Sequence, residues 1–236
     1  MHKRLLGLLL CLLAAPAWAQ VNEVDAALER GYEAFQLGRY QQAALEYRAA
    51  LAWPGAHAAR AYFNLGVCLH RLKQPREAAA AYEQALKLRA GRDATAAYAL
   101  GLAWQDADEH AAARRAFAQV LAVTANRHPD AQLQLGLEWQ RAGELAQAAE
   151  HYRQAIAQSG DRQPVGHNNL GVILVWQGKL REAEQEFTQA WQQSRGKLKE
   201  AEQNLALCQQ RRAGTQGLLL AQVPAKPLRA RSQSEN

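Results

Sequence analysis

The apolar and small residues of this chain recur with a period of 35 residues. Within each period, apolar side chains return every three or four positions in two successive segments, which predicts a pair of antiparallel helices. A glycine interrupts the first segment of every period, at Gly31, Gly66, Gly101, Gly136 and Gly171. An aromatic residue follows sixteen positions later in the second segment, at Tyr47, Tyr82, Phe117, Tyr152 and Phe187. The pattern predicts an all-α fold.

The glycines occupy positions that are unfavourable for helix formation. Glycine in a helix interior costs about 1 kcal/mol relative to alanine, so its return in every repeat needs a packing reason. We expect the second helix to approach the first at this point, with the aromatic side chain packed against it. A turn near Gly38, Gly143 and Gly178 joins the two helices, and Lys73 and Asp108 replace glycine in the other two repeats.

The repeat resembles the tetratricopeptide repeat, a helix-turn-helix unit of about 34 residues with small, Leu-Gly, alanine and aromatic signature positions. Two copies share the same four residues in their first segment, Asn-Leu-Gly-Val, at 64–67 and 169–172. The resemblance implies a right-handed α-solenoid with five tandem repeats over residues 24–196. A half repeat over residues 197–212 would act as a C-terminal capping helix, which makes about five and a half repeats in all. Arg30 departs from the leucine expected in the first repeat.

Residues 1–19 have the pattern of a secretory signal peptide. A basic start precedes an apolar run over residues 5–15, and Ala17 and Ala19 supply the small residues of a cleavage site before Gln20. The mature protein is therefore expected in the periplasm or outside the cell. The apolar run is too short to span a membrane, so no transmembrane anchor is expected. Cys11 leaves a lipoprotein alternative, which Leu10 disfavours because such signals carry a small residue there.

The C-terminal residues 213–236 depart from the repeat and are rich in glycine, proline and polar residues, which predicts a flexible tail. Within this tail, residues 217–223 form an apolar segment that reads Gly-Leu-Leu-Leu-Ala-Gln-Val. Two interpretations stay open. The segment docks on the chain's own repeats, since exposed apolar runs usually have a partner, or it is only an apolar part of a flexible end.

The charge distribution argues against a nucleic-acid partner. The chain has 28 basic and 22 acidic residues, and most of the excess lies at its two ends. The repeats therefore lack the basic stripe of a nucleic-acid interface. Cys68 and Cys208 lie four repeats apart, too far for a disulfide, and are expected to be buried core residues.

No motif points to catalysis. The histidines show no pairing at three or four residues, so we expect surface side chains and no metal site. No serine lies in a Gly-x-Ser-x-Gly motif. The acidic turn around Asp106, Asp108 and Glu109 lacks the ligand spacing of a calcium loop. No catalytic residue, metal site or cofactor is predicted.

In tetratricopeptide repeats the first helix of each pair lines a concave inner wall. By this resemblance, a peptide-binding groove would be lined by the apolar residues Phe63, Tyr98, Leu102, Leu133 and Leu137. Its polar border would comprise Asn64, Gln134, Asn169, Asn204, Arg71 and Arg141. Amide side chains can both donate to and accept from an extended peptide backbone. A second interpretation, in which these polar residues only keep the wall hydrated, stays open.

The resemblance implies a non-catalytic protein–protein interaction scaffold. Together with the signal peptide, it predicts a protein of the bacterial cell envelope that binds peptide segments of other envelope proteins and serves envelope assembly. The alternative is an envelope enzyme, or an accessory subunit of one, whose polar site matches no motif.

Overall fold

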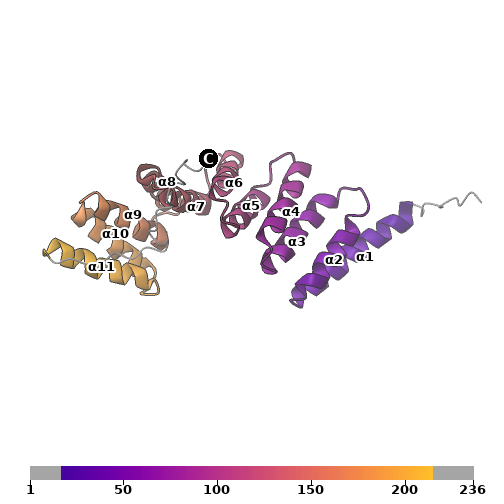
Figure 1. Cartoon of the computed structure of the whole chain (residues 1–236), viewed down its shortest axis with the longest axis horizontal. Helices are drawn as coiled ribbons and strands as arrows, with labels where there is room; N and C mark the ends of the chain where they lie inside the picture. Colours follow the sequence, from indigo (N-terminus) through magenta and orange to yellow (C-terminus); the bar gives the residue numbers. More distant parts are fainter. Residues whose placement is uncertain (1–16, 215–236) are drawn as a thin grey trace, which may run out of the picture. The chain divides into compact units, whose positions relative to one another are not determined.

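In a computed structural model, residues 17–214 are described, with the side chains of residues 22–214. These residues form eleven α-helices and no strand, which confirms the all-α prediction (Figure 1). The helices are α1 (Ala17–Gln36), α2 (Tyr40–Ala50), α3 (Ala58–Arg71), α4 (Pro75–Leu88), α5 (Ala94–Asp106), α6 (His110–Val123), α7 (Pro129–Arg141), α8 (Leu145–Gln158), α9 (Pro164–Trp176), α10 (Leu180–Gln193) and α11 (Lys199–Arg212). Pairs expected from the period pack together, as α1 with α2, α5 with α6, α7 with α8 and α9 with α10.

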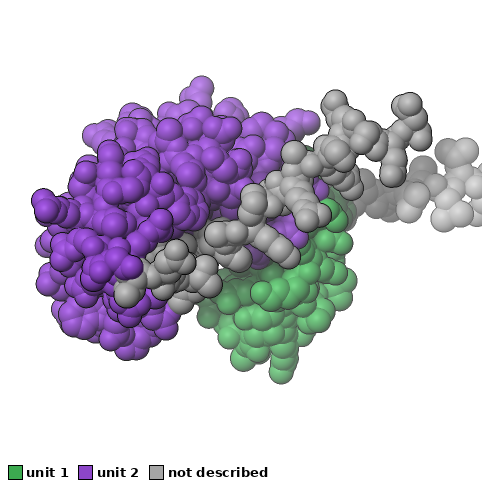
Figure 2. Space-filling model, turned by 60° about the vertical axis from the view of Figure 1, so that its left-hand side comes forward, with its two compact units in different colours: residues 1–85 green, residues 86–236 purple. Residues whose placement is uncertain are grey.

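The chain divides into two compact units between Ala85 and Leu86, within α4 (Figure 2). The described part of unit 1 holds α1 to α3 and most of α4, and that of unit 2 holds the end of α4 and α5 to α11. The apolar run of the expected signal peptide and the apolar tail segment at 217–223 lie outside the described residues. The division assigns the predicted groove residues of α3 to unit 1 and all the others to unit 2.

The turn inside each helix pair passes through one residue in the left-handed region. The φ angle is +72° at Gly38, +82° at Gly143 and +78° at Gly178. Lys73 and Asp108 adopt the same conformation, at φ +61° and +60°, although a side chain disfavours it by about 1–2 kcal/mol. After each of these two residues, the next N–H donates to the carbonyl five positions earlier, at 2.9 Å. The turn is therefore kept where its glycine is missing.

Replacing the exposed Lys73 or Asp108 by glycine is expected to raise the free energy of unfolding by up to about 1 kcal/mol. Relief of the left-handed conformation, about 1–2 kcal/mol, exceeds the about 0.4–1 kcal/mol that glycine costs through the unfolded chain. Urea denaturation of both variants measures the change. Gly143→Ala is the matched control and should lower stability; a loss of stability in both glycine variants would contradict the strain argument.

The helical glycines face the aromatic ring of the paired helix. A Cβ atom on Gly171 would lie 2.6 Å from Cε1 of Phe187, and one on Gly136 would lie 2.5 Å from Cε1 of Tyr152. Both aromatic side chains are completely buried. The same ring contact recurs at Gly31, Gly66 and Gly101. The paired helices therefore leave no room for a side chain at this position, which confirms the packing prediction.

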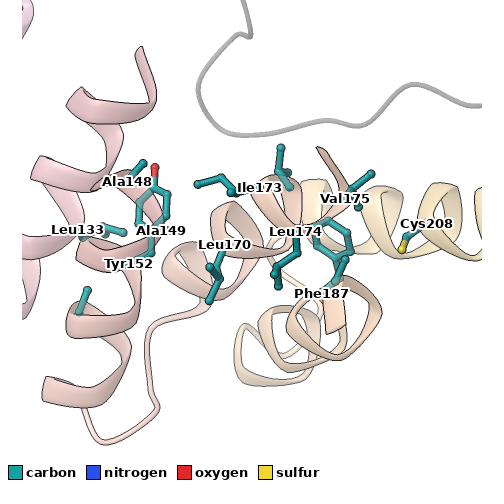
Figure 3. Close-up of a cluster of buried hydrophobic side chains, with 13 residues drawn as sticks. Leu133, Ala148, Ala149, Tyr152, Leu170, Ile173, Leu174, Val175, Phe187 and Cys208 are labelled. Atoms are coloured by element: carbon teal, nitrogen blue, oxygen red, sulfur yellow. The ribbon is translucent and has the colours of Figure 1, made fainter. Parts of the chain in front are cut away.

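One apolar core links α7 to α11 in unit 2 (Figure 3). Tyr152, Ile173 and Phe187 are among its largest fully buried side chains. The last helix, α11, adds buried Cys208, whose Sγ donates to the carbonyl oxygen of Leu180 at 3.4 Å. The other side of α11 is exposed and polar, as at Glu202. This helix therefore covers the end of the apolar core with a hydrated surface.

Candidate peptide-binding face

In unit 1, the predicted groove residues lie on α3. Phe63 is half-buried against Tyr82, with ring centroids 5.6 Å apart. Asn64 lies beside the hydroxyl of Tyr47. Burial raises the pKa of Tyr47, and the hydrogen bond from Asn64 partly offsets this rise. The Asn64 amide is thus already engaged inside the protein, whereas Arg71 is exposed.

A pocket of about 430 Å³, which the sequence pattern did not predict, lies between α1 and α3. It is lined by Asp25, Leu28, Glu29, Tyr32, Glu33, Arg60 and Asn64. Three carboxylates against one guanidinium make its wall negative. The tyrosine is 59% exposed. Asp25, Glu29 and Glu33 are spaced by four residues, which puts them on one helix face. This spacing could have indicated the acidic wall of the pocket from the sequence.

In unit 2, the apolar part of the predicted groove lies on α5 and α7. Tyr98 packs on Phe117, with ring centroids 5.6 Å apart, and stacks on His128 at 5.2 Å. Burial raises the pKa of Tyr98. Leu133 is almost fully buried, whereas Leu102 and Leu137 stay partly exposed. The accessible apolar surface is therefore smaller than predicted. On α5 and α7 it consists mainly of these two leucines and the edge of the tyrosine.

A buried carboxylate is the least expected feature of this face. Glu138 on α7 is fully buried, with Oε2 2.9 Å from Nδ1 of His110 on α6. Gln105 donates through Nε2 to Glu138 Oε1 at 2.8 Å and to Gln134 Oε1 at 3.0 Å. The Nε of Arg141 lies 3.7 Å from Glu138 Oε1 and makes no hydrogen bond. Predicted groove residues Gln134 and Arg141 therefore belong to one polar network centred on this carboxylate.

The predicted amide residues of α9 and α11 point inward. Asn169 and Asn204 are fully buried. Asn204 Nδ2 donates to Asn168 Oδ1 at 3.0 Å, and Asn168 Nδ2 donates to Asn169 Oδ1 at 3.1 Å. Burial raises the pKa of Tyr152, and the nearby Asn169 amide partly offsets the rise. The Nδ2 of Asn169 has no partner in hydrogen-bonding geometry. Asn168, which was not among the predicted groove residues, joins the two predicted amides.

The expectation that the histidines are surface side chains is wrong for His167. Its side chain is 4% exposed, and Nδ1 lies 2.6 Å from Glu186 Oε2. This contact links α9 to α10. The imidazole can be buried here because the Glu186 carboxylate is its partner. Cys68 and Cys208 are free and buried, and burial raises the pKa of the Cys68 thiol to about 11.

Within the described residues, no three His, Cys, Asp or Glu side chains come together as a metal site. Across residues 17–214, no helix has the length and apolar character of a membrane span. What this face offers chemically is apolar contact, amide groups and the guanidinium groups of Arg71 and Arg141, which are groups that can recognise peptides.

Family comparison matches two segments of the chain to tetratricopeptide repeat models, residues 59–90 and residues 133–197. The second segment runs from α7 through α10, the helices that carry much of the face in unit 2. The chain is a tetratricopeptide repeat protein. A search of curated protein sequences found no significant match.

Solved structures of other tetratricopeptide repeat proteins share the fold. A crystal structure of MamA is 25% identical, covers 72% of this chain and 96% of its own, and has a TM-score of 0.65. YrrB, described as a tetratricopeptide repeat protein with an unusual peptide-binding site, is 19% identical, with coverages of 78% and 96% and a TM-score of 0.63. PilF of Pseudomonas aeruginosa is 21% identical, with coverages of 83% and 93% and a TM-score of 0.61. The repeat-solenoid prediction is confirmed.

Proposed function

We propose that this tetratricopeptide repeat protein is a non-catalytic scaffold of the bacterial cell envelope. It binds a peptide segment of another envelope protein on the face formed by its first helices. The repeat fold supports a protein–protein interaction role, and the peptide-binding site of YrrB offers a parallel within the same fold. The signal-peptide pattern of residues 1–19 supports the compartment and a role in envelope assembly.

The observation that carries the proposal is the accessible apolar strip of unit 2. Leu102 and Leu137 occupy the same position of successive repeats and are both partly exposed. Repeated positions on neighbouring first helices offer evenly spaced contacts to an extended or helical peptide. An apolar side chain of the partner that covers each leucine removes apolar surface from water, which is the main source of affinity in such a groove.

Arg141 gives this strip a polar edge. Its side chain is 35% exposed, and its Nε donor makes no hydrogen bond. The exposed part of its guanidinium can donate to a carbonyl or carboxylate of the bound peptide. Because Glu138 sits beneath this guanidinium, the arginine is held at the edge of the strip before the partner arrives.

Leu137→Glu is expected to weaken partner binding about tenfold or more, because covering a leucine is worth about 1.5–3 kcal/mol and each 1.4 kcal/mol is about tenfold in affinity. The measurement is recovery of partner proteins from a detergent-solubilised envelope extract on the immobilised mature protein. Val123→Glu is the matched control, since this valine is 37% exposed on α6, a second helix. Equal recovery by wild type and Leu137→Glu would contradict the proposal.

A further inference from the structure

The pocket between α1 and α3 in unit 1 occupies the same repeat positions as the proposed peptide-binding face. Tyr32 on α1 directly follows a helical glycine, as Leu102 and Leu137 do in later repeats. Asn64 on α3 lies two positions before its helical glycine, as Gln134 does. By repeat position, the pocket is therefore the counterpart in the first two repeats of the apolar strip of unit 2.

The helix α1 makes this pocket acidic. Asp25, Glu29 and Glu33 form one row along the helix and are all exposed. Like charges four residues apart repel each other on a helix. Within residues 22–214, no ion pair joins any of the three to a basic side chain, whereas Glu46 on α2 has Arg30 as its partner at 2.8 Å. The charge of the row is therefore not neutralised by an ion pair of the described chain.

The lining combines this charge with an aromatic wall. Tyr32 is 59% exposed, and Leu28 below it is almost fully buried. Arg60 is the one basic residue of the lining, so three carboxylates and one guanidinium leave an excess of two negative charges. The carboxylates do not come together as a metal site, since no such group occurs among the described residues. An organic cation with an extended shape fits this lining better than a metal ion.

Among the cationic side chains, arginine matches the pocket most closely. Its planar guanidinium stacks on an aromatic face while its N–H groups donate to carboxylates. A lysine ammonium is a point charge without that planar fork. Tyr32 supplies the exposed ring, and Glu29 on the same helix supplies an exposed carboxylate.

The spacing of the acidic row fits an extended peptide. Successive carboxylates of the row are offset by about 6 Å along α1, because four residues rise about 1.5 Å each. Every second residue of an extended chain is offset by about 6.6 Å, and its side chains point to the same side. Basic side chains at alternate positions of a peptide therefore stay in register with the row.

We propose that the pocket between α1 and α3 binds arginine side chains at alternate positions of the partner's peptide segment. One arginine stacks on Tyr32 and donates to Glu29, and its neighbours in the register pair with Asp25 and Glu33. This inference rests on the proposed function, since it takes the first helices as the peptide site, and it adds the chemistry of the partner. Unit 1 selects positive charge, whereas the strip of unit 2 contributes apolar contact.

Fluorescence anisotropy with the full mature protein tests the proposal. The probe is a fluorescein-labelled synthetic peptide with the sequence Ser-Arg-Leu-Arg-Leu-Arg-Ser. Glu29→Gln combined with Glu33→Gln is expected to weaken its binding about fivefold or more, since one exposed ion pair is worth at most about fivefold in affinity. Glu77→Gln combined with Glu83→Gln is the matched control. It removes the same charge from exposed positions of α4 outside the pocket and should leave binding unchanged.

Two further comparisons distinguish a site from general attraction to negative charge. Tyr32→Ser should weaken binding about twofold to fivefold, the loss of stacking at an exposed site, whereas Tyr32→Phe retains the ring and should bind like wild type. A second peptide, Ser-Leu-Arg-Arg-Arg-Leu-Ser, has the same composition but contiguous arginines. It should bind more weakly, because an extended chain directs its middle arginine away from the row.

Equal losses in the two double variants would overturn the proposal, since any exposed carboxylate would then serve. Wild-type binding by the Glu29→Gln, Glu33→Gln variant would overturn it as well. Equal affinity for the two peptides, together with no effect of Tyr32→Ser, would reduce the binding to unspecific charge attraction and contradict the site. Partner recovery by the Leu137→Glu variant is a separate readout in unit 2, so failure of the arginine site is distinguishable from failure of the proposed function.

Discussion

Gly171→Leu is expected to lower the free energy of unfolding by about 1–3 kcal/mol or more, the cost of overpacking a tight core. Even a Cβ atom at this position would lie 2.6 Å from Cε1 and 2.8 Å from Cδ1 of Phe187. The ring is completely buried, so it cannot move away without disturbing the side chains packed around it. The extra side chain must push α9 and α10 apart, and urea denaturation measures the loss.

Ala206→Leu is the matched control for this prediction. Ala206 lies 35 residues after Gly171, on α11, the last of the described helices, and is exposed. The same side chain added there should change stability little, within about 0.5 kcal/mol for a surface site. Phe187→Leu combined with Gly171→Ala should recover part of the stability that Gly171→Ala loses. A wild-type stability for Gly171→Leu would refute the idea that the helical glycines mark close packing.

Replacing His167 by leucine is expected to cost about 1.5–3 kcal/mol at pH 6, the usual range for a hydrogen bond to a charged group. The ring connects two acidic side chains: Nδ1 lies 2.6 Å from Glu186 Oε2, and Nε2 lies 3.2 Å from Asp161 Oδ1. Leucine fills similar space but leaves both carboxylates without this partner. Denaturation of wild type and variant at the same pH gives the difference directly.

The pH dependence of this difference has a defined sign. Burial by itself lowers the pKa of His167, but the hydrogen bond and charge of Glu186, together with Asp161, outweigh it and hold the pKa above the usual 6.5. A raised pKa in the folded state contributes stability that is complete below the unfolded-state pKa and is lost as pH rises through the folded-state pKa. The advantage of wild type over His167→Leu should therefore shrink as pH rises above about 6.5.

His151 is the matched control for the pH experiment. Burial lowers its pKa, and its Nδ1 faces the neutral amide of Gln132 at 2.7 Å. Its contribution to stability should therefore grow as pH rises toward about 6.5. Two histidines with opposite slopes separate the specific effect of Glu186 and Asp161 from the titration of all other groups. Parallel slopes in the two variants would contradict the assignment.

The repeat architecture could be predicted from the sequence because small and aromatic residues constrain each other across a helix pair. Gly171 and Phe187 are sixteen residues apart, yet each makes sense only if the other packs against it. Five repetitions of the same pair leave no alternative to stacked helix pairs. The left-handed turns at Lys73 and Asp108 also follow from the 35-residue period, because glycine occupies the same position in the other repeats. Lysine and aspartate by themselves would not predict a left-handed residue.

The candidate site was harder to predict because its polar residues bond to one another. Asn169 and Asn204 were expected at a peptide-facing border, whereas the structure buries both and joins them through Asn168. Repeat position alone gives the direction of a side chain but not its depth, which depends on what the next repeat places over it. Glu138 did leave a signal: it occupies the position of Cys68, a buried residue of an earlier repeat, and a carboxylate there requires partners.

The most direct test of the central claim is photo-crosslinking in the native envelope from single sites on the protein. A photoreactive amino acid at Leu102 or Leu137 on the proposed face is compared with one at Val123 on the second helix α6. The account predicts that the two sites on the face crosslink to one contiguous peptide segment of an envelope protein and that the site at Val123 does not. Crosslinks from Val123 to the same partner with equal yield, or partner contacts scattered over a folded surface, would contradict a peptide-binding face on the first helices.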